Sequence, residues 1–272
     1  MKIEFYYPRW GSEHLEWDVF LKNVKNAGYD GIEYALASNI SKEELRRISE
    51  KLKGHDLKLI LQHFDTYESD FKKHCTAYAN WLDLVKPIEV VKINSQTGKD
   101  FFSFDENNQL IALAQEFAIA NGIEICHETH RNKFSFACHI TKPYLENNPE
   151  LKITLDVSHW VTVAESYLED QTESMALALS RTEHIHVRVG HTQGPQVTDP
   201  RAPEWQEALN HHLLWWDKIV ERKKLNNDDV LTITTEFGPP PYMMTQPFTT
   251  KPLASQWDIN ECIKDLLKKR YT

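Results

Sequence analysis

The chain has 272 residues, of which 41% are hydrophobic and 26% are charged, and its formal net charge is −9. These proportions are ordinary for a soluble globular protein, and no basic stripe could neutralise a phosphate backbone. We therefore expect no nucleic-acid partner. The nine glycines never form the G-x-G-x-x-G or G-x-x-x-x-G-K spacing, which disfavours a glycine-loop nucleotide site.

Membrane and secretion signals are also missing from the sequence. No stretch approaches the roughly 18 apolar residues of a membrane helix, and the first residues enter a strand-like pattern without a signal-peptide core. We expect a cytoplasmic protein with no membrane partner, either a monomer or a homo-oligomer. The four cysteines are widely spaced without a C-x-x-C motif, which indicates neither a zinc ribbon nor a disulfide framework.

Strand-like and helix-like segments alternate along the whole chain. Runs rich in Ile, Val, Leu and Tyr predict strands that begin near residues 3, 31, 57, 90, 123, 151, 183 and 230. The stretches between them have helical periodicity. Ser41 to Glu44 and Ser103 to Glu106 resemble capping boxes, and Gly28, Gly54 and Gly122 stand where helices should end.

Strict alternation of strands and helices predicts a parallel sheet. Eight strand–helix units in about 250 residues is the size of a closed (β/α)₈ TIM barrel, and no linker divides the chain. We therefore predict an α/β fold with one TIM-barrel domain over residues 1–272. An open doubly wound sheet is the alternative, but it usually carries the glycine fingerprint that is missing here.

Two connections are longer than a barrel needs, near residues 190–202 and 238–252. Both follow predicted strands and contain prolines. In a TIM barrel the loops that follow the strands cover the active-site face. We expect these two loops to contribute to specificity.

Ionisable residues gather at the ends of the last four predicted strands. Side chains of a strand alternate between its two faces, so the apolar residues of these strands should face the helices and the others should point into the barrel. Four inward residues fall at the catalytic ends of neighbouring strands: Glu128, Asp156, His186 and Glu236. We expect them to converge on one point.

Three carboxylates held close together repel one another unless a positive charge lies among them. A divalent metal ion meets this need. Three oxygen ligands and one imidazole suit Mn²⁺, Zn²⁺, Co²⁺ or Mg²⁺, and a set of four protein ligands leaves positions open for substrate oxygens.

The order of these residues resembles a known family. Glu on strand five, Asp156-Val-Ser-His159 after strand six, His on strand seven and Glu on strand eight are similar to the xylose isomerase-like TIM barrels. The match is with the sugar (phosphate) isomerase/epimerase branch, which includes tagatose epimerase-like and hydroxypyruvate isomerase-like enzymes. The segment of residues 17–34 also resembles the family's first helix and second strand.

This resemblance implies a metal-dependent isomerase or epimerase that acts on a small-molecule sugar or sugar phosphate. One divalent ion, usually Mn²⁺, would be held by Glu128, Asp156, His186 and Glu236. Glu128 and Glu236 would be the catalytic acid/base pair that moves a proton next to a carbonyl through a metal-stabilised enediolate. His159 would help to hold a substrate oxygen.

Further candidates for substrate contact come from alternation and composition. Arg188 lies two residues beyond His186 on the same face, and His63 ends the third strand. Lys92 and Asn94 are predicted to point inward on strand four, and Trp160 offers a flat face for a sugar. Glu33 on strand two is expected to satisfy hydrogen bonds inside the barrel.

Three other functions remain open. An inosose dehydratase-like lyase would use the same metal and the same proton abstraction but would expel a hydroxyl. An apurinic-site endonuclease-like phosphodiesterase would need extra histidines, and strand four ends in Asn94 where one is wanted. A non-catalytic sugar-binding barrel is disfavoured because both expected bases are present.

Overall fold

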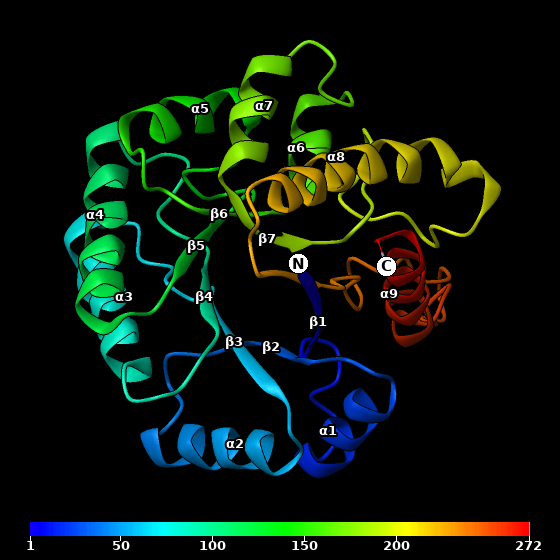
Figure 1. The fold of residues 1–272 in the computed structure, drawn as a ribbon, viewed down its shortest axis with the longest axis horizontal. Coiled ribbons are helices and arrows are strands. Elements are labelled where there is room, and N and C mark those ends of the chain that lie inside the picture. The colour runs from blue at the N-terminus through cyan, green and yellow to red at the C-terminus, as the bar shows by residue number, and fades with distance from the viewer. Residues whose placement is uncertain (272) are drawn as a thin grey trace.

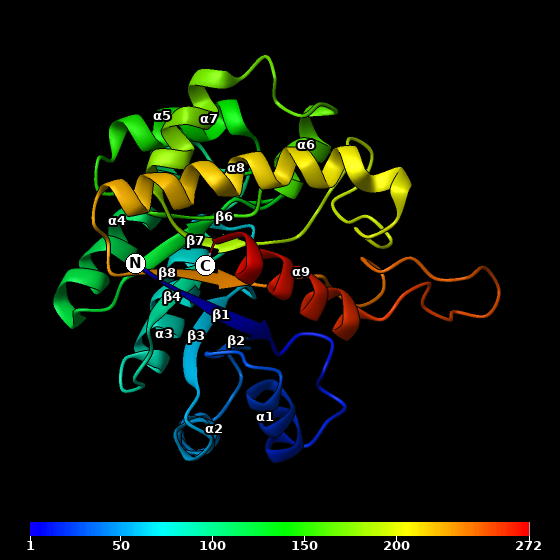
Figure 2. The same cartoon turned by 45° about the vertical axis from the view of Figure 1, so that its right-hand side comes forward.

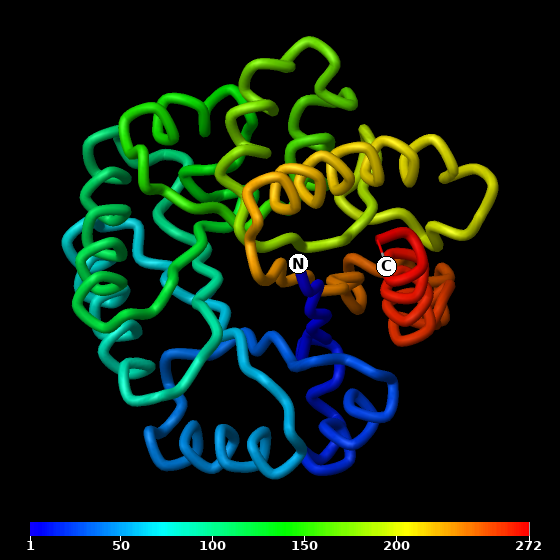
Figure 3. The backbone as a smooth tube through the Cα atoms, viewed as in Figure 1, coloured from blue at the N-terminus to red at the C-terminus, as the bar shows by residue number. Residues whose placement is uncertain are grey.

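In the computed structural model, which describes residues 1–271, eight parallel strands form a closed barrel in the order of the chain. Figure 1 looks into this barrel, and Figure 3 follows the chain around it. The strands are β1 (Lys2–Pro8), β2 (Gly31–Ala35), β3 (Lys58–His63), β4 (Lys92–Ser95), β5 (Ile125–Glu128), β6 (Ile153–Leu155), β7 (Thr182–His186) and β8 (Val230–Thr234). Each strand begins within two residues of its predicted position, so the predicted barrel is confirmed.

Helices surround the barrel (Figure 1). They are α1 (Trp17–Asn26), α2 (Lys42–Gly54), α3 (Phe71–Val85), α4 (Phe104–Asn121), α5 (Cys138–Asn147), α6 (Val157–Ala164), α7 (Thr172–Arg181), α8 (Gln206–Leu225) and α9 (Gln256–Tyr271). A 3₁₀ turn, η1 (Pro203–Trp205), precedes α8. In the part of the chain that the structure describes, no helix has the length and apolar character needed to cross a membrane.

The main core lies between the strands and this ring of helices. Leu59 and Leu61 of β3, for example, are buried in one apolar cluster with Trp81 and Leu82 of α3. Burying such side chains removes apolar surface from water, which is the main stabilising contribution to folding. The inward faces of the strands are then free to carry polar residues toward the barrel axis.

The predicted helix ends are mostly confirmed. Ser103 and Glu106 form a complete capping box at α4, and Gly122 ends that helix in the left-handed conformation. Ser41 caps α2 by accepting from the backbone N–H of Glu44. Gly54 differs from its prediction because it is the last residue of α2, and His55 is the cap.

The two long loops follow β7 and β8, as the sequence predicted. The loop after β8 projects away from the barrel before α9 begins (Figure 2). Both loops leave the carboxyl-terminal ends of the strands, which is the face where TIM barrels build their sites.

Candidate metal centre

Four buried side chains meet at the carboxyl-terminal end of the barrel. Glu128 is the last residue of β5 and His186 the last residue of β7, while Asp156 follows β6 and Glu236 lies just beyond β8. Each offers one ligand atom, and these four atoms lie within 4.8 Å of one another. The parallel strands bring together residues that are up to 108 positions apart, because all their carboxyl ends meet at one rim.

Three of these groups have a buried atom without a hydrogen-bond partner among the described residues: Glu128 Oε1, His186 Nδ1 and Glu236 Oε2. His186 Nδ1 lies 2.8 Å from Glu236 Oε2, but without hydrogen-bond geometry. Buried polar atoms without partners are rare and costly. A divalent cation between them would supply the missing partner, and three carboxylates with one imidazole are a donor set that Mn²⁺ accepts. The residues therefore fit a metal ion.

The second oxygen of Glu128 is held by side-chain amides. Its Oε2 accepts from Gln62 Nε2 at 3.0 Å, from Asn94 Nδ2 at 2.9 Å and from Gln96 Nε2 at 3.2 Å. These amides come from β3, from β4 and from the residue after β4. They fix the carboxylate so that Oε1 is the atom left to face the other three residues.

Asp156 has two roles in the local structure. It caps α6 by accepting from the backbone N–H of Ser158 at 3.1 Å, which places His159 within the first turn of that helix. Its Oδ2 forms an ion pair with Arg188, whose Nη2 also lies 3.3 Å from Glu236 Oε2. Arg188 is buried and so supplies positive charge directly to two of the carboxylates.

The charges of the cluster act differently on its two glutamates. Burial, together with the nearby carboxylates of Glu236 and Asp156, raises the pKa of Glu128 to about 7. Burial also opposes ionisation of Glu236, but Arg188 and His186, which is protonated while no metal ion is held at its Nδ1, outweigh it and lower the pKa of Glu236. Two carboxyl groups with opposite shifts in one site are typical of acid/base pairs.

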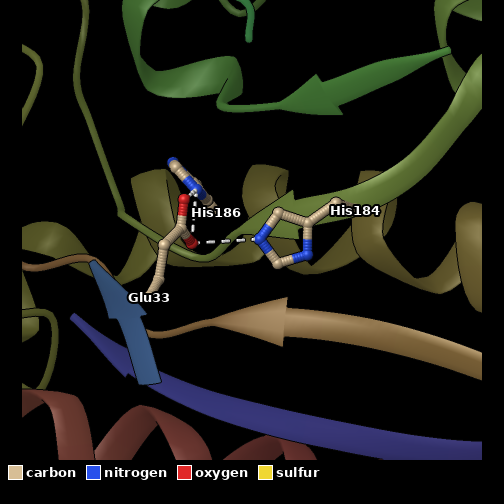
Figure 4. A group of neighbouring side chains, drawn as sticks. All are labelled: Glu33, His184 and His186. Carbon is tan, nitrogen blue, oxygen red and sulfur yellow. Dashed lines mark hydrogen bonds and ion pairs between the residues drawn. The ribbon is translucent and has the colours of Figure 1, made fainter. Parts of the chain in front are cut away.

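Glu33 of β2 lies beneath the cluster and binds two histidines, as Figure 4 shows. Its carboxylate oxygens lie 3.1 and 3.0 Å from His186 Nε2 and 3.2 Å from His184 Nε2. Thr234 and Asn94 also donate to it. A carboxylate at Nε2 favours the tautomer with the proton on that nitrogen, which leaves the lone pair of Nδ1 for a metal. Glu33 thus satisfies interior hydrogen bonds, as expected, and also orients a metal-ligand candidate.

We expect Glu33→Gln to weaken metal binding by about 10- to 100-fold, the usual effect of losing an outer partner of a ligating histidine. Titration of the metal-free protein with Mn²⁺ measures this. Glu4→Gln is the matched control, because Glu4 is also a buried carboxylate of the barrel but binds Lys2, Lys58 and Tyr6. Equal Mn²⁺ affinities for Glu33→Gln and the unmodified protein would show that Glu33 does not orient His186.

A cavity of about 300 Å³ lies above the cluster. Glu128, Glu236 and Arg188 form part of its wall, and Trp10, Phe64 and Tyr242 contribute aromatic surface. Trp10 and Tyr242 pack edge to face with ring centroids 5.3 Å apart. Gly238 permits this approach, since a Cβ there would lie 2.2 Å from the Trp10 ring.

His130 also lines the cavity. Its Nδ1 lies 2.7 Å from the carbonyl oxygen of Arg131, which can only accept, so Nδ1 carries the ring proton. Burial lowers the pKa of His130 to about 3, and the neutral ring has a free acceptor at Nε2. His130 can therefore accept a hydrogen bond from a hydroxyl in the cavity.

His159 lies between two guanidinium groups. Arg131 Nε donates to its Nδ1 at 3.0 Å, and Arg188 Nη2 lies 2.9 Å from its Nε2. With Glu128 and His130, His159 forms a second group of closely spaced donor atoms. Because both ring nitrogens already face guanidinium groups, that second group is a poorer metal site than the first.

Three predicted substrate contacts lie elsewhere. His63 was expected to point inward, but β3 turns Gln62 into the barrel and His63 outward against Tyr78 and Trp81 of α3. Trp160 is buried in the core and donates to the carbonyl of Ser135, so no face is free for a sugar.

Lys92 is the first residue of β4, at the end of the barrel opposite the cavity. It pairs there with Glu124 at 2.8 Å and donates to the carbonyl of Glu183. Asn94, by contrast, points inward as predicted and contacts Glu128, Glu33 and His186.

Several residues around the cluster were not predicted from the sequence. Gln62 could have been found by counting the alternation of β3 outward from Leu59 and Leu61. Arg131 and Tyr242 lie on loops, where no periodic pattern indicates direction.

Comparison with known proteins supports the fold. No protein-family model matches the chain, and no curated protein matches it significantly. Among solved structures, the probable 3-DHS dehydratase AsbF from Bacillus anthracis has a TM-score of 0.62 and 18% identity, over 98% of this chain and 99% of that chain. A D-psicose 3-epimerase has a TM-score of 0.61 and 15% identity, over 99% and 98%. Endonuclease IV from Thermus thermophilus has a TM-score of 0.57 and 12% identity, over 99% and 100%.

These neighbours are xylose isomerase-like TIM-barrel enzymes. The resemblance stated from the sequence motifs is therefore confirmed at the level of the fold. The neighbours include an epimerase, a dehydratase and an endonuclease, so the shared fold does not select one reaction.

Proposed function

We propose that this protein is a divalent-metal-dependent isomerase or epimerase of a small sugar-like carbonyl compound. One observation carries the proposal. Ligand atoms of Glu128, His186 and Glu236 are buried without hydrogen-bond partners, and two of these residues also line a cavity large enough for a small molecule. The proposed ligands are Glu128, Asp156, His186 and Glu236, with Mn²⁺ the best match to the donor set.

When bound, the cation would stabilise negative charge that develops on a substrate oxygen. Glu128 and Glu236 both line the cavity and are the candidates for the pair that takes the carbon-bound proton and returns one. His130 and Arg188 line the same cavity and would orient hydroxyl groups. Return of the proton to the same carbon gives an epimer, and return to the neighbouring carbon gives an isomer.

A phosphodiesterase with several metals is less well supported. The second oxygen of Glu128 accepts from the amides of Gln62, Asn94 and Gln96. Amide N–H groups are hydrogen-bond donors, so the three that surround this oxygen cannot serve as ligands of a second cation. A dehydratase would use the same proposed acid/base pair and is distinguished by its product.

The test is a panel of free and phosphorylated ketoses incubated with the Mn²⁺-loaded protein in D₂O. We expect deuterium to enter one carbon of at least one ketose, together with an epimer or isomer, as measured by NMR. Loss of water from the substrate would assign the lyase reaction instead. If no ketose exchanges a carbon-bound proton, while abasic DNA is nicked efficiently, the proposal is wrong.

A further inference from the structure

A second hollow adjoins the candidate metal centre. It is a groove of about 530 Å³ between the loops that follow β5, β7 and β8. Tyr242 belongs to the walls of both the groove and the 300 Å³ cavity. A substrate whose reacting carbon lies over Glu128 and Glu236 could therefore extend past Tyr242 into this groove.

The walls of the groove are well supported. His191 and Gly194 exchange backbone hydrogen bonds of 2.8 and 3.0 Å. The ring of His191 lies 4.7 Å from that of Trp205, whose Nε1 donates to Thr198 Oγ1 at 2.9 Å. These contacts hold the loop after β7 against the turn that precedes α8.

The charge of the groove is opposite to that of the protein as a whole. The chain carries 40 acidic residues and a net charge of −9, yet no Asp or Glu lines the groove among the described residues, and Arg131 is its one charged wall residue. The cavity, by contrast, is lined by Glu13, Glu128, Glu236 and Arg188. Arg131 therefore makes the groove a local positive site beside a largely acidic cavity.

Arg131 has no acidic partner within ion-pair distance in residues 1–271. Its Nε donates to His159 at 3.0 Å, and its Nη2 donates to the hydroxyl of Tyr242 at 3.3 Å. Both partners are neutral, so they orient the guanidinium without neutralising it. Nη1 has no hydrogen bond to a described residue and is free for a ligand. A guanidinium in this state is suited to a carboxylate or phosphate oxygen.

Arg188 does not share this property, although it also lies close to Tyr242. It forms an ion pair with Asp156 and lies 3.3 Å from Glu236 Oε2, so its charge is already compensated. The guanidinium carbon of Arg188 lies 4.6 Å and that of Arg131 5.9 Å from the Tyr242 ring centre. Both arginines therefore lie beside Tyr242, but only Arg131 lacks an acidic partner among the described residues.

We propose that the groove binds an oxyanion substituent of the substrate through Arg131, so that the substrate is a sugar acid or a sugar phosphate. This inference rests on the proposed function for the position of the reacting carbon. The shared chemistry is a carboxylate or phosphate at a carbon remote from the carbonyl.

The test compares D-glucose, D-glucuronate and D-glucose 6-phosphate, which differ only at the sixth carbon, as ligands of the Mn²⁺-loaded protein. Isothermal titration calorimetry is expected to give at least tenfold tighter binding for one of the anions than for glucose, since a charge-assisted hydrogen bond is roughly twice as strong as a neutral one. The anion that binds more tightly identifies carboxylate or phosphate as the preferred group.

Arg131→Gln is expected to remove the preference for the anion, whereas Arg131→Lys should retain most of it. Arg201→Gln is the matched control, because Arg201 lies on the loop after β7 but is paired with Asp199. The proposal is overturned if all three sugars bind equally, if none binds, if the preference survives Arg131→Gln, or if the Gln and Lys variants behave alike. If deuterium exchange occurs without a preference for the anion, this inference alone is wrong and the proposed function stands. If the anion is preferred but no carbon-bound proton exchanges, the proposed function is wrong and the anion site stands.

Discussion

Glu128→Gln is expected to lower the rate of solvent-deuterium exchange at the substrate carbon by about 10³-fold or more, because a positioned acid/base group contributes about 10²- to 10⁴-fold. The substitution retains the shape of the side chain but removes its capacity to carry a transferable proton. The amides that hold Oε2 in place come from Gln62, Asn94 and Gln96, so the residue is expected to stay where it is. Exchange is measured by NMR at saturating Mn²⁺, with metal content and thermal unfolding recorded for the same sample.

Glu4→Gln is the control for this experiment. Glu4 is a buried carboxylate of the barrel that pairs with Lys2 and Lys58, and it belongs neither to the cavity wall nor to the four converging residues, so its replacement should leave exchange unchanged. Glu236→Gln should resemble Glu128→Gln. The acid/base assignment is contradicted if Glu128→Gln and Glu236→Gln both retain exchange while binding metal normally.

Asp156→Asn is expected to weaken metal binding by about 100-fold or more, since even the loss of an outer partner costs about 10- to 100-fold. The carboxylate is the ligand that hard cations prefer, and the neutral amide supplies a weaker donor. Asn retains an oxygen that can accept from the N–H of Ser158, so the cap of α6 should persist. Elemental analysis of protein purified without chelator should give about one divalent ion per chain for the unmodified protein, and much less for the variant.

The matched control is Asp199→Asn on the loop after β7. Asp199 pairs with Arg201 and is not part of the cluster, so its loss should not change metal content. If Asp156→Asn binds Mn²⁺ as tightly as the unmodified protein does, the metal centre has been placed on the wrong residues.

The positions of the strands could be predicted from sequence because their signals are local. Apolar runs, helical periodicity and caps such as Ser103 and Gly122 depend on neighbouring residues only, and they located all eight strands. The same alternation predicted that Glu128, Asp156, His186 and Glu236 would point inward from the ends of four strands. Closure of the barrel then brings them to one rim, because the parallel strands all end on the same side.

The predicted side-chain direction was wrong for His63 and Trp160. In the first case the inward face of the strand was assigned to the wrong residues, and in the second the residue lies on a helix, where strand alternation does not apply. His63 faces α3 because Leu59 and Leu61 set the outward face of β3, which turns Gln62 toward Glu128. Trp160 was expected near the cavity from its place after His159, but a helix turns successive side chains by about 100°, and this one points into the core.

By itself, then, the sequence determined the barrel, the positions of its strands along the chain and the four inward residues that could hold a metal, because each depends on short-range pattern. Only the tertiary structure decided which atoms lack partners, that Glu33 orients His186, and that Arg131 lies uncompensated in a groove beside the cavity. These features depend on contacts such as that between Arg131 and Tyr242, 111 positions apart. Loop residues this far apart carry no common periodicity, so their meeting is fixed only when the chain closes around the barrel.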